Sequence, residues 1–293
     1  MASASLRIAY RDQPLDYRYP MTVPLRIVIV GPGRAGTSVG LAALRAGHDI
    51  VGVLGRSNVI SRAATLDAPV LDWAAPLPDC DLVIVAVRDD AIRPVAELLA
   101  SSAGGAQAAT HLSGLTSVEA LTALKKVGLG IGGFHPLQTM PNPHDGSMAL
   151  SGAWVGITAG APLREKLEDL AVSIGARPFA LEDSRRPLYH AAAACAANYL
   201  LAALGMAEEA FAAAGVPFEV ARPLVTEVVA NAFDLGPRVA LTGPIARGDV
   251  GTVAAQIAAV EAVDPQLADD FKAFGRATAR LVGTGEAMRE VLE

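Results

Sequence analysis

The chain has few residues of the kinds that mark several large protein classes. Among its 293 residues there are two cysteines, and aromatic residues make up only 5%. Cys80 and Cys195 lie far apart in unrelated contexts, which excludes a disulfide framework and a zinc-ligand spacing. With so few aromatic residues, the core must consist of Ala, Val and Leu, and this composition favours Ala-rich helices in close contact.

Clusters of basic residues are also absent. The 24 Lys and Arg residues are outnumbered by 30 Asp and Glu residues, and the formal net charge is -6. Nucleic-acid binding requires clustered cations that neutralise phosphates, so the sequence argues against it. The scattered basic residues are better interpreted as ligands for a small anion.

The sequence contains no long uninterrupted apolar run. Its N-terminus lacks the continuous apolar core of a secretory signal. The most apolar helical stretch, residues 191–207, is interrupted by Asn198 and Gly205. We interpret this stretch as a buried helix and not as a membrane span. The expectation is a soluble cytoplasmic protein with no membrane partner.

From Leu25 to about residue 182, strand and helix patterns alternate, which predicts a parallel sheet with helices on both faces. The expected strands are 26–30, 50–54, 82–87, 109–112, 129–134, 154–158 and 177–181, and the expected helices are 35–46, 91–99, 118–126 and 163–174. A loop is expected over 135–143. Residues 1–24 precede this pattern and form either an appended arm or the product of an upstream start before Met21.

Every later segment has a helical pattern. Helices are expected at about 183–214, 218–234, 249–263 and 265–282, and the stretch 241–249 is expected to be a shaped loop. Asp183 or Ser184 is placed to cap the first helix, and Asp249 the third. The predicted fold is therefore α/β, with a Rossmann-type doubly wound sheet at 25–182 followed by an all-α domain at 183–293.

A glycine-rich turn follows the first expected strand. The sequence G-P-G-R-A-G places Gly31, Gly33 and Gly36 between an apolar strand and a helix. Such a turn brings a dinucleotide pyrophosphate onto the helix N-terminus. Arg34 and Ala35 belong to the same turn and are candidate cofactor ligands, together with Val87 and Arg88 after the strand at 82–87.

The end of the second expected strand indicates which dinucleotide binds. An NAD-binding protein would carry an acidic residue there, but no acid occurs between Ile50 and Arg62. Arg56 and Ser57 instead suit the 2′-phosphate of NADP. A charge-assisted contact of this kind contributes about 1.5–3 kcal/mol, enough for a preference of roughly tenfold or more. A solvated surface arginine is the alternative interpretation of Arg56.

Polar residues gather where further strands are expected to end. His111 and Ser113 belong to one such end, and His135 follows the next. Histidine can transfer a proton at neutral pH. These residues form no metal-ligand spacing, and Ser113 is not in a G-x-S-x-G elbow, which disfavours a hydrolase. A purely structural role for the histidines stays open.

In the helical half, His190 and Asn198 are two turns apart on roughly one side of the long expected helix. They either face a ligand or bond across a helix interface. Arg247 either binds a substrate carboxylate or pairs with Asp249. We take His111, Ser113, His135, His190, Asn198 and Arg247 as the candidate catalytic residues.

Together these segments resemble a known family. The motifs are G-P-G-R-A-G, H-L-S-G, G-G-F-H-P-L-Q-T, Y-H-A-A-A-A-C-A-A-N-Y-L and L-T-G-P-I-A-R-G-D. They resemble Rossmann-like oxidoreductases whose C-terminal half is a domain of unknown function, similar in build to 6-phosphogluconate dehydrogenase and ketopantoate reductase. The resemblance implies an NADP-binding domain, a helical domain that forms a homodimer, and an active site between the two. The chain lacks the helix lysine of the ketopantoate enzymes, and His190 is its nearest analogue.

Three hypotheses follow. The first is an NADPH-dependent reductase of a small 2-keto or imino acid, with ketopantoate as a candidate. His190 or His135 would donate the proton, Asn198 would polarise the carbonyl and Arg247 would bind a carboxylate. The second is a prephenate-type dehydrogenase, because His135-Pro136 after a Gly-Gly strand resembles a motif of that family. The third is an NADP-binding sensor without turnover.

Overall fold

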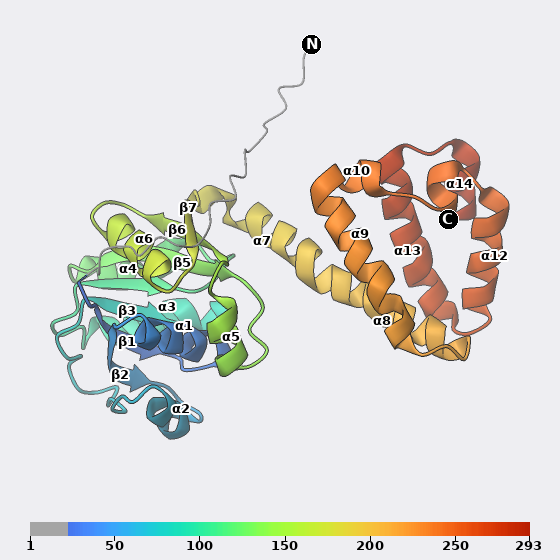
Figure 1. Ribbon diagram of the computed structural model, residues 1–293. Helices are drawn as coiled ribbons and strands as arrows, with labels where there is room; N and C mark the ends of the chain where they lie inside the picture. The colour runs from blue at the N-terminus through green and yellow to red at the C-terminus, as the bar shows by residue number, and fades with distance from the viewer. Residues whose placement is uncertain (1–22) are drawn as a thin grey trace, which may run out of the picture. The chain divides into compact units, whose positions relative to one another are not determined.

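The computed structural model describes residues 23–293, and the chain divides between Ala192 and Ala193 into two compact units (Figure 1). The expected arm at residues 1–24 lies outside the described part except for its last two residues. Each unit is considered by itself below.

The first unit is built on a seven-stranded sheet with the strand order β2-β1-β3-β4-β5-β6-β7. The strands are β1 (Arg26–Val30), β2 (Asp49–Leu54), β3 (Leu82–Val85), β4 (Ala108–His111), β5 (Gly130–Leu137), β6 (Trp154–Ala159) and β7 (Arg177–Ala180). The helices are α1 (Arg34–Arg45), α2 (Val59–Thr65), α3 (Asp89–Ala100), η1 (Val118–Leu121), α4 (Thr122–Lys126), α5 (Pro143–Ala149), α6 (Leu163–Ser173), η2 (Asp183–Arg185) and α7 (Arg186–Ala194), which crosses the boundary.

The two faces of the sheet have separate cores. On β1, Ile27 and Ile29 pack with residues of α1 and α6, whereas Val28 and Val30 pack with residues of α3 and α4. Successive residues of a strand point to opposite faces, so an unbroken apolar strand covered on both sides follows from the run R-I-V-I-V. The predicted doubly wound α/β fold is confirmed.

The expectation of a wholly parallel sheet is wrong at one position, because β6 runs antiparallel to β5. The chain between them forms α5 and does not cross over the sheet. Helix α5 is held against α1 by Arg45, which donates hydrogen bonds to the hydroxyl and the carbonyl oxygen of Ser147 at 3.0 and 2.7 Å. Its start carries a recognisable signal, since Asn142 caps it and Pro143 is its first residue.

The strand β5 is also longer than expected. The predicted strand ended at residue 134, but β5 continues to Leu137 and pairs with β6 along the way. His135 therefore lies on a strand and not in the loop predicted over 135–143. The antiparallel partner provides the backbone hydrogen bonds that extend the strand.

The second unit is helical, as predicted. It contains a π-helical turn η3 (Cys195–Tyr199), α8 (Leu200–Ala213), η4 (Phe218–Val220), α9 (Ala221–Leu235), α10 (Pro237–Ala240), α11 (Pro244–Arg247), α12 (Val250–Glu261), α13 (Pro265–Val282) and α14 (Glu286–Val291). Its core is small and consists of residues from α12, α13 and α14. Asp249 caps α12 as predicted, accepting from the backbone N–H of Thr252 at 3.1 Å. The loop expected over 241–249 contains the short helix α11.

The apolar helix expected to be buried is exposed. Within residues 23–293, one helical segment, Asp183–Ala213, is long and apolar enough by composition to cross a membrane, and none of its most apolar window is buried within this chain. The prediction failed because an apolar helix pattern indicates that the helix surface is shielded from water, but it does not specify whether the same chain or a partner shields it.

Candidate functional site

The glycine turn has the shape that a bound pyrophosphate requires. Gly31 has a φ of +86°, and a Cβ there would lie 2.6 Å from Cγ1 of Val87, beyond the end of β3. Gly33 precedes α1 and provides no side-chain cap, and no described atom other than those of its chain neighbours lies within 4 Å of the position of a Cβ on it. The first N–H groups of α1 therefore have no side-chain cap and are available to an anion at the helix N-terminus.

The end of β2 lies beside this turn. The N–H of Gly31 donates to the carbonyl oxygen of Leu54 at 2.8 Å, and Arg56 and Ser57 are the second and third residues after Leu54, so they follow this contact closely. Arg34, Arg56 and Ser57 are exposed, and among the described residues neither arginine forms an ion pair. Both arginines are therefore available for phosphate groups.

Arg88 is less free than the sequence suggests. It precedes α3 and pairs with Asp90, and both side chains are exposed. Exposed pairs of this kind contribute little to stability, so the pairing does not prevent Arg88 from turning to a ligand.

His135 and His190 come together from β5 and α7, with ring centroids 5.9 Å apart. A Cβ on Gly114 would lie 2.7 Å from Nε2 of His135 and 2.7 Å from Nδ1 of His190. Two ring nitrogens thus converge on the side of Gly114 that carries no side chain. We call Gly114, His135 and His190 the histidine site.

Tyr189 contacts the other side of the His135 ring. Its hydroxyl oxygen lies 2.8 Å from Nδ1 of His135, and the two rings meet edge to face. Burial raises the pKa of the Tyr189 phenol to about 12, against a smaller opposing effect of Arg186. The phenol is therefore protonated at neutral pH and can donate.

His135 is neutral at neutral pH. Burial lowers the pKa of its imidazole to about 4, and His190 and Arg186 add to the effect. The carboxylate of Asp89, at the start of α3, acts in the opposite direction on this pKa. The end of β3 therefore lies within electrostatic reach of the histidine site.

His111 and Ser113 lie in the adjoining segment. The His111 side chain is 0% exposed, and burial followed by the charge of Arg186 lowers its pKa to about 4. Among residues 23–293, neither ring nitrogen of His111 has a hydrogen-bond partner of ordinary geometry, although the backbone of Ser117 is near enough to raise its pKa slightly. His111 thus supports the site from the interior.

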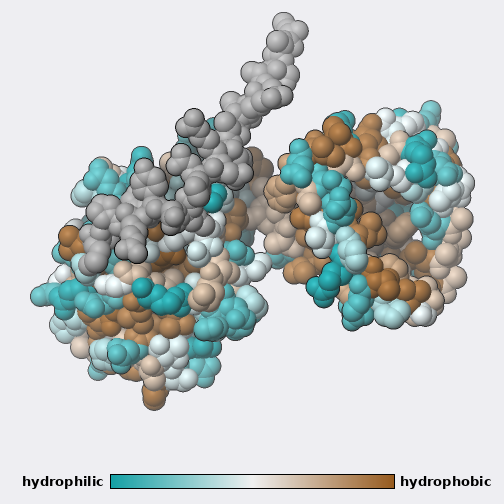
Figure 2. Space-filling view, viewed as in Figure 1, coloured by the Kyte–Doolittle hydropathy of each residue, from teal (hydrophilic) through white to brown (hydrophobic). Residues whose placement is uncertain are grey.

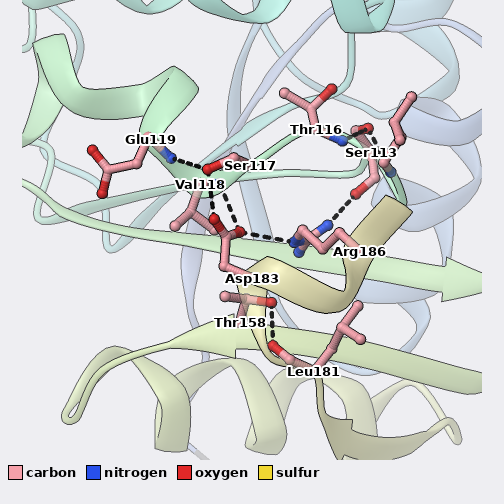
Figure 3. Close-up of polar contacts among 10 residues, drawn as sticks. Ser113, Thr116, Ser117, Val118, Glu119, Thr158, Leu181, Asp183 and Arg186 are labelled. Atoms are coloured by element: carbon pink, nitrogen blue, oxygen red, sulfur yellow. Dashed lines mark hydrogen bonds and ion pairs between the residues drawn. The ribbon is translucent and has the colours of Figure 1, made fainter. Parts of the chain in front are cut away.

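A buried arginine ties the 113–118 segment to the start of α7 (Figure 3). Arg186 is 0% exposed, donates to the carbonyl oxygen of Ser113 at 2.7 Å and pairs with Asp183 at 3.2 Å. Asp183 also accepts from the hydroxyl of Ser117 at 2.5 Å and from the N–H of Val118 at 3.0 Å. The expected capping role of Asp183 in its own helix is therefore wrong, because the 117–118 segment takes both of its oxygens.

Sequence reasoning did not identify Tyr189, Arg186 or Gly114 as site residues. Tyr189 and Arg186 stand close to His190 in an otherwise apolar helix, and Gly114 follows Ser113. Polar residues at the start of an Ala-rich helix require hydrogen-bond partners, and this requirement could have identified Tyr189 and Arg186 from the sequence.

Two family models match the chain, each over less than half of it. Residues 16–136 match a Rossmann-like domain, and residues 153–278 match a domain of unknown function, DUF2520. This confirms the resemblance that the motifs indicated. None of the curated proteins is detectably similar in sequence.

Solved structures with the same fold cover nearly all of the chain. A candidate NADP oxidoreductase from Bacteroides fragilis is 23% identical with a TM-score of 0.76, over 88% of this chain and 98% of the other. An imine reductase from Myxococcus stipitatus in complex with NADP+ is 16% identical with a TM-score of 0.63, over 92% and 100%. A reductive aminase from Aspergillus terreus, in complex with NADPH and ethyl levulinate, is 19% identical with a TM-score of 0.61, over 92% and 97%.

The DUF2520 match includes His190, Asn198 and Arg247. Asn198 lies in the π-helical turn η3, which interrupts the α-helical spacing on which its predicted alignment with His190 depended. Arg247 ends α11, between Gly243 and Gly248 with φ of +98° and +73°. Both residues belong to the second unit, so the first unit alone brings together only His111, Ser113, His135 and His190.

Proposed function

We propose that the chain is an NADP(H)-dependent oxidoreductase that reduces a small 2-keto or imino acid, with ketopantoate as one candidate. The observation that carries the proposal is the convergence of His135 Nε2 and His190 Nδ1 at Gly114. In open α/β sheets, ligands bind beyond the carboxyl ends of the strands. The histidine site and the glycine turn both lie at this edge of the sheet.

The residues around the glycine turn fit NADP. The open start of α1 suits the pyrophosphate, and Arg56 with Ser57 suits the 2′-phosphate. Val87 and Arg88 adjoin the turn after β3. When bound, NADPH supplies a hydride. The imine reductase and the reductive aminase, whose structures contain NADP+ and NADPH, support this chemistry for the shared fold.

The histidine site receives the reacting oxygen or nitrogen of the substrate. A heteroatom beside Gly114 comes within hydrogen-bond reach of both rings, and one of the two histidines supplies the proton. In the second unit, Asn198 polarises the carbonyl and Arg247 binds the carboxylate. Both roles are suited to the side chains, since an amide N–H and a guanidinium donate to oxygen acceptors.

The test is NADPH oxidation by the full-length protein with a panel of 2-keto acids, including ketopantoate, and cyclic imines. Turnover that disappears in His190→Ala supports the proposal. Reduction of NADP+ on addition of prephenate would replace it with the dehydrogenase alternative. Tight NADPH binding with no turnover across the panel would leave a sensor, and absence of NADPH binding would overturn all three.

The second unit presents a surface that a second copy of the chain would cover. Leu224, Val228 and Leu235 are 64%, 56% and 55% exposed, and their spacing places them on one face of α9. Figure 2 shows apolar patches on the surface of this unit. Exposed apolar area of this kind marks an interaction surface. The proposal is therefore a homodimer, found in the cytoplasmic fraction.

A further inference from the structure

We propose that Tyr189 fixes the tautomer of His135, so that His135 acts as a neutral Nε2–H donor to the substrate and His190 transfers the proton. This inference rests on the proposed function for its substrate, but its structural half can be tested without turnover. It assigns polarisation of the C=O bond to His135 and proton transfer to His190, whereas the proposed function does not say which histidine does which.

The direction of the Tyr189–His135 hydrogen bond is set by what each partner can donate. In a neutral imidazole one nitrogen carries the hydrogen and the other accepts. If Nδ1 accepts from the Tyr189 hydroxyl, which lies 2.8 Å away, the hydrogen of His135 must be on Nε2. The reverse direction would leave the partly buried hydroxyl hydrogen without an acceptor, because the Tyr189 hydroxyl forms no other hydrogen bond among the described residues.

The Nε2–H of His135 then points to the space beside Gly114. This nitrogen lies 2.7 Å from the position of a Cβ on Gly114, and so does Nδ1 of His190, which has no hydrogen-bond partner among the described residues. A substrate oxygen in this space accepts from His135 and is within reach of His190. The absence of a side chain at residue 114 makes the space available.

The groups that face His135 keep it uncharged. Arg186 and His190 approach from α7, His111 approaches from β4, and only Asp89, at the start of α3, favours the charged ring. Burial, which is the largest cause, together with Arg186 and the two histidines outweighs Asp89 and lowers the pKa of His135 to about 4. A neutral imidazole N–H is a good hydrogen-bond donor but a very weak acid, so His135 polarises the C=O bond and does not give up its proton.

His190 is suited to transfer the proton to the substrate. It is only partly buried, and its Nδ1 is the nitrogen that faces the space beside Gly114. With NADPH bound, a hydride would add to the carbonyl carbon while the electron pair of the C=O π bond takes a proton from Nδ1 of His190. The products would be an alcohol and NADP+, and solvent would return the proton to His190. For an imine the same steps give an amine.

The first test is nitrogen NMR of the full-length protein labelled in its histidine rings, with the His135 signals assigned through His135→Gln. The wild type is expected to show a bare Nδ1 and a protonated Nε2 at neutral pH. Tyr189→Phe should shift His135 toward the other tautomer. Tyr199→Phe is the matched control, because Tyr199 is exposed, and it should leave the His135 signals unchanged. A wild-type His135 protonated on Nδ1, or spectra unaffected by Tyr189→Phe, would overturn the inference whatever the substrate is.

The second test uses any substrate that the keto-acid and imine panel identifies. His190→Gln should lower kcat about 100-fold or more and remove the pH dependence of the proton donor. His135→Gln retains an N–H donor and should retain that pH dependence, with a smaller loss than His135→Ala. Tyr189→Phe should lower kcat and leave KM nearly unchanged. Loss of the pH dependence in His135→Gln, with retention in His190→Gln, would reverse the assignment. A panel without turnover would count against the proposed function and leave the NMR result standing.

Discussion

The hydroxyl oxygen of Tyr189 lies 2.8 Å from Nδ1 of His135, so a side chain of α7 orients a side chain of β5. The same helix contributes His190, and its first residue, Arg186, holds the segment that carries Ser113. A single helix therefore positions most of the histidine site. The five predictions that follow test this arrangement, the cofactor site beside it and the surface of the second unit.

Gly114→Ala should fill the space between the two histidines. The new methyl group would lie 2.7 Å from a ring nitrogen of each, closer than real Cβ contacts, so a substrate heteroatom could no longer enter. We expect turnover to fall about tenfold or more while NADPH affinity, measured by calorimetry, is unchanged. The control is Gly160→Ala, because nothing lies within 4 Å of a Cβ at that exposed position. Equal activity of both variants would mean that the reaction takes place elsewhere.

Arg56→Ala should weaken NADPH binding and leave NADH binding unchanged. The guanidinium contributes a charge-assisted contact to the 2′-phosphate that NADH lacks, and its removal should cost about tenfold or more in Kd. Arg93 is an exposed arginine on α3, and Arg93→Ala provides the control. If Arg56→Ala affects both dinucleotides equally, the assignment of Arg56 to the 2′-phosphate is wrong.

Asp183→Asn should destabilise the first unit. It removes the charge that faces the fully buried Arg186 and weakens the acceptor for Ser117 and Val118. Since Asp183 is partly exposed, we expect a loss of about 2–3 kcal/mol in the free energy of unfolding, below the 3–5 kcal/mol of a fully buried pair. Urea denaturation provides the measurement. Glu182→Gln removes an exposed pair with Arg185 and should cost much less stability than Asp183→Asn.

Stability should fall as the pH is lowered from about 6.5 toward 4. The pKa of buried His111 is lowered to about 4 in the folded protein, whereas it is near 6.5 when unfolded, so the unfolded state binds more protons between these values. The stabilising contribution is complete above pH 6.5 and is lost toward pH 4, at a cost on the order of 2–3 kcal/mol. Melting temperatures across this range should fall less steeply in His111→Asn than in the wild type. Replacement of exposed His144 by Asn should leave the dependence of the melting temperature on pH as in the wild type. If His111→Asn also shows the wild-type dependence, the pKa of His111 is not lowered in the folded protein.

Val228→Glu should dissociate the proposed homodimer. A carboxylate in the middle of the exposed face of α9 would be buried without a partner in the dimer. Light scattering after size-exclusion chromatography should show a dimer for the wild type and a monomer for the variant. Ile60→Glu, at an even more exposed apolar position on α2, should remain a dimer. A monomeric wild type would require another partner for the apolar face.

Features that depend on local sequence could be predicted. The run R-I-V-I-V and the turn G-P-G-R-A-G define β1 and the start of α1, because an apolar strand and a glycine turn each have a local signature. The helix at 265–282 was predicted with its bounds, since Asp264 caps it and Gly283 follows it. The helical repeat and the cap residues together define both ends.

Features that depend on contacts distant in sequence could not be predicted. The antiparallel direction of β6 follows from the docking of α5 on α1, which no local pattern indicates. Asp183 has the sequence of a helix cap but bonds to Ser117 and Val118, 66 and 65 residues away. Tyr189 was identified only when β5 and α7 were seen together. Sequence reasoning found the chemistry of the histidines and missed the groups that orient them.

The central claim is hydride transfer from NADPH to a substrate bound at the histidine site, and isotope transfer tests it most directly. The full-length protein is incubated with ketopantoate or an active panel member and with NADPH that carries deuterium at the transferable position of the nicotinamide ring. The account predicts one deuterium on the former carbonyl or imine carbon of the product by mass spectrometry, with the transfer abolished in His190→Gln. A product without deuterium, or undiminished transfer in His190→Gln, would contradict it.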